Sequence, residues 1–272
     1  MPLFPCINTS TIRPVALSEK LDLIARVGFR HVELWNDEID QHKKVTGESL
    51  IQVHNRLSDL GLSVPSVVAM MNWADAPSEE LPKVLEECRR RAEQAAAVGS
   101  VSIIASPPKG FVSINDFCDR FEMVREIAER EGLKTYLEFL GFTQQYHTLD
   151  SVLSCSRRYP AGRVPIVADS FHLIRGGGSL EDLQKLTSPA ELGIFHINDL
   201  PSDPPFANQT DHDRVMLGEG VIDLKKVVRL LVDSGYEGCV SLELFNQDLW
   251  QSDPESVLRT GYQRLSELLY SS

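Results

Sequence analysis

Eight short apolar segments, each followed by a longer amphipathic one, are the feature that most limits how this chain can fold. The apolar segments span residues 3–7, 31–35, 64–70, 101–106, 134–140, 164–169, 194–199 and 239–245. They predict strands, and the intervening segments repeat apolar residues at the spacing of an α-helix. Because most strand positions are apolar, we expect parallel strands that are covered on both faces.

Glycines mark the points where each predicted helix gives way to the next strand. They recur every 30 to 42 residues, close to an eighth of the 272-residue chain, at Gly28, Gly61, Gly99, Gly132, Gly162, Gly193 and Gly235. Glycine is favoured after a helix because it adopts positive φ without strain. We therefore predict a single α/β domain over residues 1–272, a (β/α)8 TIM barrel. A doubly wound open sheet is the alternative, but the G-x-G-x-x-G turn expected after its first strand is absent.

Composition excludes several classes of protein. A hydrophobic share of 42% and a charged share of 24% are typical of a folded globular chain. The net charge of −12 disfavours a nucleic-acid partner, since that affinity comes from clustered Lys and Arg. The five cysteines form no C-x-x-C pair, and no apolar signal or membrane segment is present. We expect a cytoplasmic protein with no membrane partner.

Four consecutive predicted strands carry a polar residue toward their carboxyl ends: Glu138, Asp169, His196 and Glu243. In a barrel these ends meet at one mouth. One imidazole and three carboxylates form a ligand set that suits one divalent metal ion, such as Zn, Mn, Co or Mg. Without a cation, the like charges would repel one another. Taken singly, each residue could instead be a hydrogen-bonded residue at a strand end.

Four further residues are candidates for substrate binding. His172 lies three residues after Asp169, and Glu33 and Trp35 share one face of the second strand. Arg214 lies in a long segment, 200–220, that follows the seventh strand. Long loops on this side of a barrel carry substrate-handling residues, although the segment could also be a tolerated surface loop. Glu33 and Trp35 could be structural, and Arg214 could simply pair with Asp211 or Asp213.

Such a site favours carbohydrate-like substrates whose neighbouring oxygens chelate a cation. The metal would polarise a carbonyl group while a carboxylate moves the proton on the adjacent carbon. The expected partner is therefore a small polyol or sugar, and we allow for a homodimer.

Several segments together resemble the xylose-isomerase-like TIM-barrel superfamily of sugar isomerases, epimerases and endonuclease IV. They are YLEFLG, VADSFH, FHIND, DHDRVMLGEGVID and SLELF. The fourth contains the string Asp213, Arg214, Gly218, Gly220, Ile222 and Asp223. Within the superfamily the likeness is greatest to the inosose (2-keto-myo-inositol) isomerases. The resemblance implies a metal held by Glu138, Asp169, His196 and Glu243, with His172 and Arg214 near the substrate, and a role in inositol catabolism.

The implied reaction moves a carbonyl to the adjacent carbon of a polyol ketone by α-proton transfer through a metal-bound enediolate, with Glu138 and Glu243 as the proton-transfer residues. Ketose 3-epimerases typically carry a carboxylate and an arginine where this chain has Gln144 and Ser202, which disfavours epimerisation. Seven histidines and the acidic charge fit an endonuclease poorly. The remaining alternatives are an inosose dehydratase and a non-catalytic sugar-binding barrel.

Overall fold

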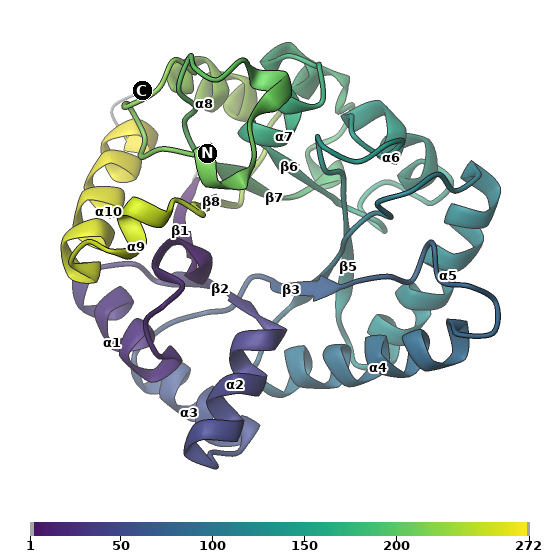
Figure 1. Cartoon of the computed structure of the whole chain (residues 1–272), viewed down its shortest axis with the longest axis horizontal. Helices are drawn as coiled ribbons and strands as arrows, with labels where there is room; N and C mark the ends of the chain where they lie inside the picture. Colours follow the sequence, from purple (N-terminus) through teal and green to yellow (C-terminus); the bar gives the residue numbers. More distant parts are fainter. Residues whose placement is uncertain (1–2, 271–272) are drawn as a thin grey trace.

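A closed barrel of eight parallel strands forms the centre of the molecule. The computed structural model describes residues 3–270. The strands pair in chain order and β8 closes onto β1, with the helices outside (Figure 1), so the predicted TIM barrel is confirmed. The strands are β1 (Phe4–Asn8), β2 (His31–Trp35), β3 (Val67–Met70), β4 (Ser102–Ala105), β5 (Lys134–Glu138), β6 (Ile166–Asp169), β7 (Leu192–Ile197) and β8 (Cys239–Leu242).

Helices follow the strands and cover the outside of the barrel. They are α1 (Leu17–Val27), α2 (Asn36–Thr46), α3 (Leu50–Asp59), α4 (Leu81–Ala97), α5 (Ile114–Arg130), α6 (Leu149–Ser156), α7 (Ser170–Arg175), α8 (Leu224–Asp233), α9 (Gln247–Trp250) and α10 (Pro254–Tyr270). Short 3-10 turns are η1 (Thr9–Ile12), η2 (Leu180–Lys185), η3 (Pro189–Glu191), η4 (Phe206–Asn208) and η5 (Asp211–Asp213). Within residues 3–270, no helix combines the length and the apolar character needed to span a bilayer.

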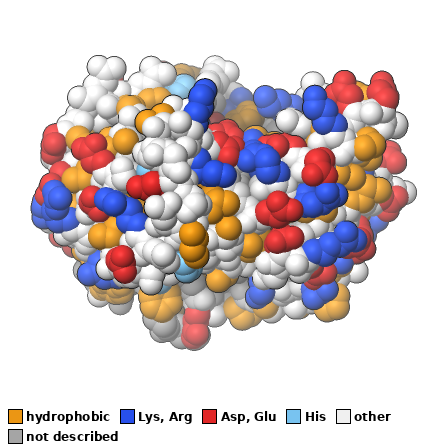
Figure 2. Space-filling model, turned by 90° about the horizontal axis from the view of Figure 1, so that it is seen from below, with side chains coloured by type: hydrophobic (Ala, Val, Ile, Leu, Met, Phe, Trp, Pro, Cys, Tyr) orange, Lys and Arg blue, Asp and Glu red, His pale blue; other side chains and the backbone are white. Residues whose placement is uncertain are grey.

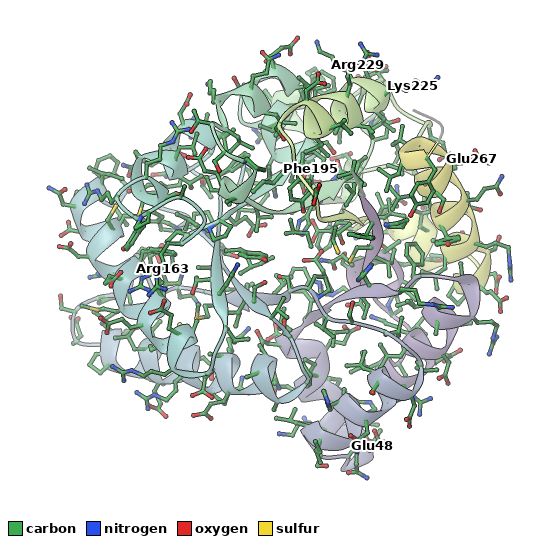
Figure 3. All side chains as sticks on the ribbon, turned by 180° about the vertical axis from the view of Figure 1, so that it is seen from behind. Glu48, Arg163, Phe195, Lys225, Arg229 and Glu267 are labelled. Carbon is green, nitrogen blue, oxygen red and sulfur yellow. The ribbon has the colours of Figure 1, made fainter. Side chains whose placement is uncertain are left out.

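The apolar side chains form two layers because successive strand residues point to opposite faces. A large layer packs between strands and helices, whereas a small cluster contains Val68, Ala69, Ile104, Tyr136, Val167 and Ile194. On β7, Ile194 belongs to the small cluster and Phe195 to the large one. His196 therefore shares the inner face of the barrel with Ile194. Figure 3 shows Phe195 near the centre, whereas Lys225, Arg229 and Glu267 lie at the periphery.

The charged residues are distributed over the surface. On the face drawn in Figure 2, acidic and basic side chains are intermixed.

The helix-to-strand glycines are confirmed at six of the seven predicted positions. Gly28, Gly61, Gly99, Gly132, Gly162 and Gly235 all have positive φ. The prediction is wrong for Gly193, which lies inside β7. A Cβ atom at this position would lie 2.8 Å from the Tyr136 ring, so Gly193 provides space inside the barrel.

Five strands, β3, β4, β5, β6 and β8, are shorter than the sequence suggests, and the difference is largest for β3 and β8. β3 begins at Val67 rather than residue 64, and Val64 forms only an isolated bridge with Ser100. β8 ends at Leu242 rather than residue 245. Glu243 therefore lies just beyond the strand, where the backbone turns toward the mouth of the barrel.

Candidate active site

The four predicted metal ligands all lie at the carboxyl ends of their strands. Glu138 ends β5, Asp169 ends β6, His196 lies in β7 and Glu243 follows β8, and all four are buried. Asp169, His196 and Glu243 each offer a ligand atom within 4.8 Å of the others. Glu138 lies outside that group, and its Oε2 accepts a hydrogen bond of 2.9 Å from Ser106 Oγ. The structure thus brings three of the four residues into one cluster.

His196 lies between two carboxylates. Its Nε2 is 2.9 Å from Glu33 Oε2, and its Nδ1 is 3.1 Å from Glu243 Oε2. Burial alone would lower the pKa of His196, but the charges of Glu243 and Glu33 outweigh burial and hold this pKa well above its ordinary value. Glu33 is fully buried and is not among the residues that line the cavity. Its contact with substrate stays a prediction; in the structure Glu33 contacts His196 and Asn8.

Arg214 is buried at the same place. Its Nη1 donates to Asp169 Oδ2 at 3.0 Å and to Glu243 Oε2 at 2.7 Å, and its Nη2 donates to Asp211 Oδ1 at 2.6 Å. The guanidinium also lies over the Phe171 ring, with its carbon 4.7 Å from the centroid. Of the two pairings that the sequence left open, the structure shows Asp211. Asp213 instead accepts from Thr210.

His172 lies in α7 and faces the cavity beside Arg214. Its Nδ1 accepts a hydrogen bond of 3.1 Å from the Gly141 N–H, and its Nε2 is 3.3 Å from Arg214 Nη2. Burial lowers the pKa of His172. Both ring nitrogens face donors, the Gly141 N–H and the Arg214 guanidinium, so a neutral His172 ring can accept from only one of them.

The two cavity-lining glutamates have opposite electrostatic surroundings. Burial, with a contribution from Glu243, raises the pKa of Glu138 to about 8. Burial also acts on Glu243, but His196 and Arg214 outweigh it and hold the pKa of Glu243 well below its usual range. His196 and Arg214 therefore compensate Glu243, whereas the charge of His196 only partly offsets the effect of burial on Glu138.

A cavity of about 400 Å³ opens above this cluster. Its lining includes Glu138, Glu243, His172, Arg214 and Trp35, so five sequence-predicted residues border one space. This volume is within the range of small-molecule sites. Phe245 packs edge-on against Trp35 with centroids 5.8 Å apart and supplies an apolar wall.

Asn8 is a site residue that sequence reasoning missed. It ends β1, and its Nδ2 donates to Glu243 Oε1 at 3.0 Å. Its Oδ1 accepts from Trp35 Nε1 at 2.7 Å. Trp35 thus contributes both to the cavity wall and to the support of Asn8. The available signal was the same one that identified Glu138, a polar residue immediately after an apolar strand.

Asp199 was also missed, and it explains the glycine-containing string after the long loop. Its buried carboxylate accepts four backbone hydrogen bonds, from Leu200 at 2.8 Å and at 3.0 Å each from Gly218, Gly220 and Ile222. A Cβ atom at position 220 would lie 2.3 Å from Asp199 Oδ1, so only glycine fits there. Asp199 also pairs through its backbone with Val215, the residue after Arg214.

The chain matches proteins of known family over most of its length. Residues 21–268 match the family described as "Xylose isomerase-like TIM barrel". An "Inosose isomerase" of Bacillus licheniformis is 26% identical over 97% of this chain and 97% of its own length. A "3-dehydroshikimate dehydratase" of Pseudomonas aeruginosa is 26% identical over 85% of this chain but only 36% of its own length.

A solved structure gives the same fold. The structure described as "IOLI protein with a binding zinc atom" superposes with a TM-score of 0.91, covers 99% of both chains and is 23% identical in sequence. At this identity the superposition establishes the shared fold.

Proposed function

Because this chain belongs to the xylose isomerase-like TIM barrel family, we propose that it is a divalent-metal-dependent isomerase that moves a carbonyl group to the adjacent carbon of a polyol ketone of the 2-keto-myo-inositol type. The observation that carries the proposal is the buried Asp169, His196 and Glu243 cluster below a cavity that Glu138 and Glu243 both line. The similarity to an inosose isomerase along nearly the whole chain supports this choice of substrate.

The donor set fits a divalent metal ion. Both ring nitrogens of His196 and one oxygen of Glu33 are buried without a well-aligned hydrogen bond. Four carboxylates, Glu33, Glu138, Asp169 and Glu243, face one imidazole and one guanidinium. Asp169, His196 and Glu243 would hold the ion, with Glu138 as the fourth ligand. The zinc atom bound in the related structure supports this assignment. When bound, the metal supplies a positive charge that polarises the substrate carbonyl and stabilises negative oxygen.

The residues of the chain then move the proton. Glu138 and Glu243 border the cavity from β5 and from the end of β8. One would remove the proton from the carbon beside the carbonyl, and the other would return a proton to the former carbonyl carbon of the resulting enediolate. The proton of the adjacent hydroxyl would pass to the former carbonyl oxygen, so that the carbonyl group ends on the adjacent carbon. His172 and Arg214 border the same space and would orient the substrate oxygens.

Loss of water is the second candidate reaction, supported by the similarity to a 3-dehydroshikimate dehydratase. A dehydratase would begin with the same proton removal, but a hydroxyl group would then leave. The same residues could serve both reactions, so the product distinguishes them.

The test is to incubate the metal-loaded protein with 2-keto-myo-inositol in D₂O and to follow the carbons by NMR. We expect deuterium next to the carbonyl and movement of the carbonyl to the adjacent carbon. An enone or dione would instead identify a dehydratase. If no inosose or ketose changes, the proposal is refuted.

A further inference from the structure

Two arginines line the cavity: Arg214 is buried and paired with carboxylates, whereas Arg13 is exposed to solvent. Arg214 is fixed by Asp169, Glu243 and Asp211. The guanidinium of Arg13 forms no hydrogen bond or ion pair within residues 3–270, although it lines the same cavity. Its one described partner is the face of the Trp35 indole, with the guanidinium carbon 5.1 Å from the centroid.

The backbone that carries Arg13 is held firmly. Arg13 follows η1, and its N–H donates to Ser10 O at 3.2 Å. Ser10 O also accepts from Trp250 Nε1 at 2.9 Å. Thr11 Oγ1 both donates to Leu242 O and accepts from Leu244 N–H. These hydrogen bonds tie the turn to the backbone on both sides of Glu243, at Leu242 and at Leu244. They fix the position from which the Arg13 side chain extends.

The Trp35 indole on which the Arg13 guanidinium stacks is connected through Asn8 to Glu243, a proposed proton-transfer residue. Trp35 donates to Asn8, and Asn8 donates to Glu243. A group held by Arg13 would therefore lie in the cavity that Glu243 also lines. The fork of an arginine guanidinium matches the oxygens of a carboxylate or phosphate, and stacking on an aromatic ring leaves that fork free.

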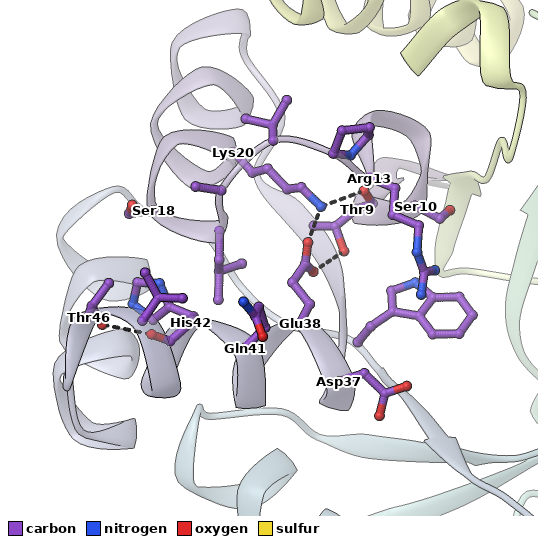
Figure 4. A pocket seen from close by; sticks show the side chains of 16 residues that line it. Thr9, Ser10, Arg13, Ser18, Lys20, Asp37, Glu38, Gln41, His42 and Thr46 are labelled. Carbon is purple, nitrogen blue, oxygen red and sulfur yellow. Dashed lines mark hydrogen bonds and ion pairs between the residues drawn. The ribbon is translucent and has the colours of Figure 1, made fainter. Parts of the chain in front are cut away.

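A second cavity of about 430 Å³ lies on the other side of Arg13 and Trp35, between η1 and α2 (Figure 4). Lys20, another cation that lines this second cavity, already has partners in the protein. Lys20 Nζ donates to Thr9 O at 3.1 Å and pairs with Glu38. Burial lowers the pKa of Lys20, and the charge of Arg13 adds to this effect. Arg13 is thus an exposed cation without an ion-pair partner among residues 3–270, at the place where the two cavities meet.

We propose that Arg13 is an anion-binding residue, and that the substrate is a cyclic polyol ketone that carries a carboxylate or phosphate group. The inference rests on the proposed function, because it concerns the same cavity. It also accounts for how a chain with a net charge of −12 would bind an anionic substrate: the cavity wall supplies a local positive charge beside the acidic cluster.

Lys109 provides a matched control. It is an exposed cation that lines the same cavity from the loop after β4, and its ammonium group has no described partner within residues 3–270. A general electrostatic attraction would depend on Arg13 and Lys109 alike. Specific binding by the stacked fork would depend on Arg13 alone.

The test measures binding to the metal-loaded protein by calorimetry. The probes are myo-inositol as a neutral ring, quinate as a carboxylate ring and myo-inositol 1-phosphate as a phosphate ring. A hydrogen-bonded charge pair corresponds to about tenfold or more in Kd, so we expect at least one anionic probe to bind at least tenfold more tightly than myo-inositol. The tighter of the two anionic probes identifies the group.

We expect Arg13→Gln to remove that preference, Arg13→Lys to retain part of it and Lys109→Gln to leave it within twofold. Unchanged binding of myo-inositol and an unchanged Tm would show that the Arg13→Gln variant is folded. The proposal is overturned if the neutral ring binds as tightly as both anions, if Arg13→Gln keeps the preference, or if Lys109→Gln reduces it equally.

The two proposals fail separately. Deuterium exchange into a neutral inosose without any anion preference would refute only the role of Arg13. Anion preference without exchange or product from any ketone would refute the proposed isomerase and leave the Arg13 site in place.

Discussion

Replacing Asp199 with asparagine tests whether one buried carboxylate holds the loop that delivers Arg214. Oδ2 accepts from Gly218 and Gly220, and Oδ1 accepts from Leu200 and Ile222. Whichever way the new amide is turned, its NH₂ group faces two backbone N–H donors. The variant therefore loses two hydrogen bonds to a charged group, at about 1.5 to 3 kcal/mol each, or about 3 to 6 kcal/mol in total.

Two assays report this loss. If the loop unfolds together with the barrel, about 3 kcal/mol lowers Tm by about 6 °C or more in a chain of this size. If the loop opens alone, its open population rises about 100-fold, and thermolysin should cleave within residues 200–220 correspondingly faster. Turnover should also fall, because Arg214 lies in this loop.

Asp203→Asn is the matched control, since Asp203 is exposed in the same loop and its carboxylate has no described partner within residues 3–270. The reasoning would be refuted if the Asp199→Asn variant had a Tm within about 1 °C of the parent and was cleaved at a rate within twofold of the parent. That result would show that the four hydrogen bonds do not hold the loop.

Three further predictions concern the site and the opposite end of the barrel. Glu243→Gln should lower turnover by about 100-fold or more, the usual contribution of a proton-transfer group. The control Glu237→Gln, which changes an exposed glutamate before β8, should leave turnover unchanged. Turnover of Glu243→Gln within tenfold of the parent would contradict the role of Glu243. Zinc at 100 times its Kd should add about 2.7 kcal/mol to the free energy of unfolding and raise Tm by about 5 to 10 °C. EDTA should reverse this increase in Tm, and His196→Ala should abolish it. Equal Tm values with and without metal would contradict the proposed metal site. Hydrogen bonds from Cys6 and His31 outweigh burial and lower the pKa of Cys239 to about 6, so its alkylation by iodoacetamide should rise with a midpoint near pH 6, because the thiolate is the nucleophile. His31→Gln should move this midpoint upward, and a midpoint near the usual thiol value in the parent would show that these contacts do not act on Cys239.

The fold and the outline of the site could be predicted because they depend on local and repeated features. The apolar segments and the glycine spacing indicated eight strand and helix units. In a parallel barrel all strands share one direction, so polar residues at the ends of four strands had to reach one mouth. The positions of Glu138, Asp169, His196 and Glu243 around that mouth follow from the topology alone.

The contacts between these residues depend on the tertiary structure. Strand stagger places Glu138 beside Ser106 and outside the cluster formed by Asp169, His196 and Glu243. It also brings Asn8 to Glu243, 235 positions away in sequence, and Glu33 to His196. Such pairings depend on register and on the direction of each side chain, and no local pattern encodes them.

Arg214 shows most clearly which features the sequence determines and which the tertiary structure decides. The sequence placed this arginine in a long loop after the seventh strand and left its partner open. The folded loop, held by Asp199, buries the guanidinium against Asp169 and Glu243, whereas Arg13 lines the same cavity as an exposed arginine. The sequence by itself determined the barrel and which residues reach its mouth, because strand order and direction follow from the chain. Which charges pair there was decided only by the tertiary structure, because pairing depends on distances of a few ångströms between segments far apart in the chain.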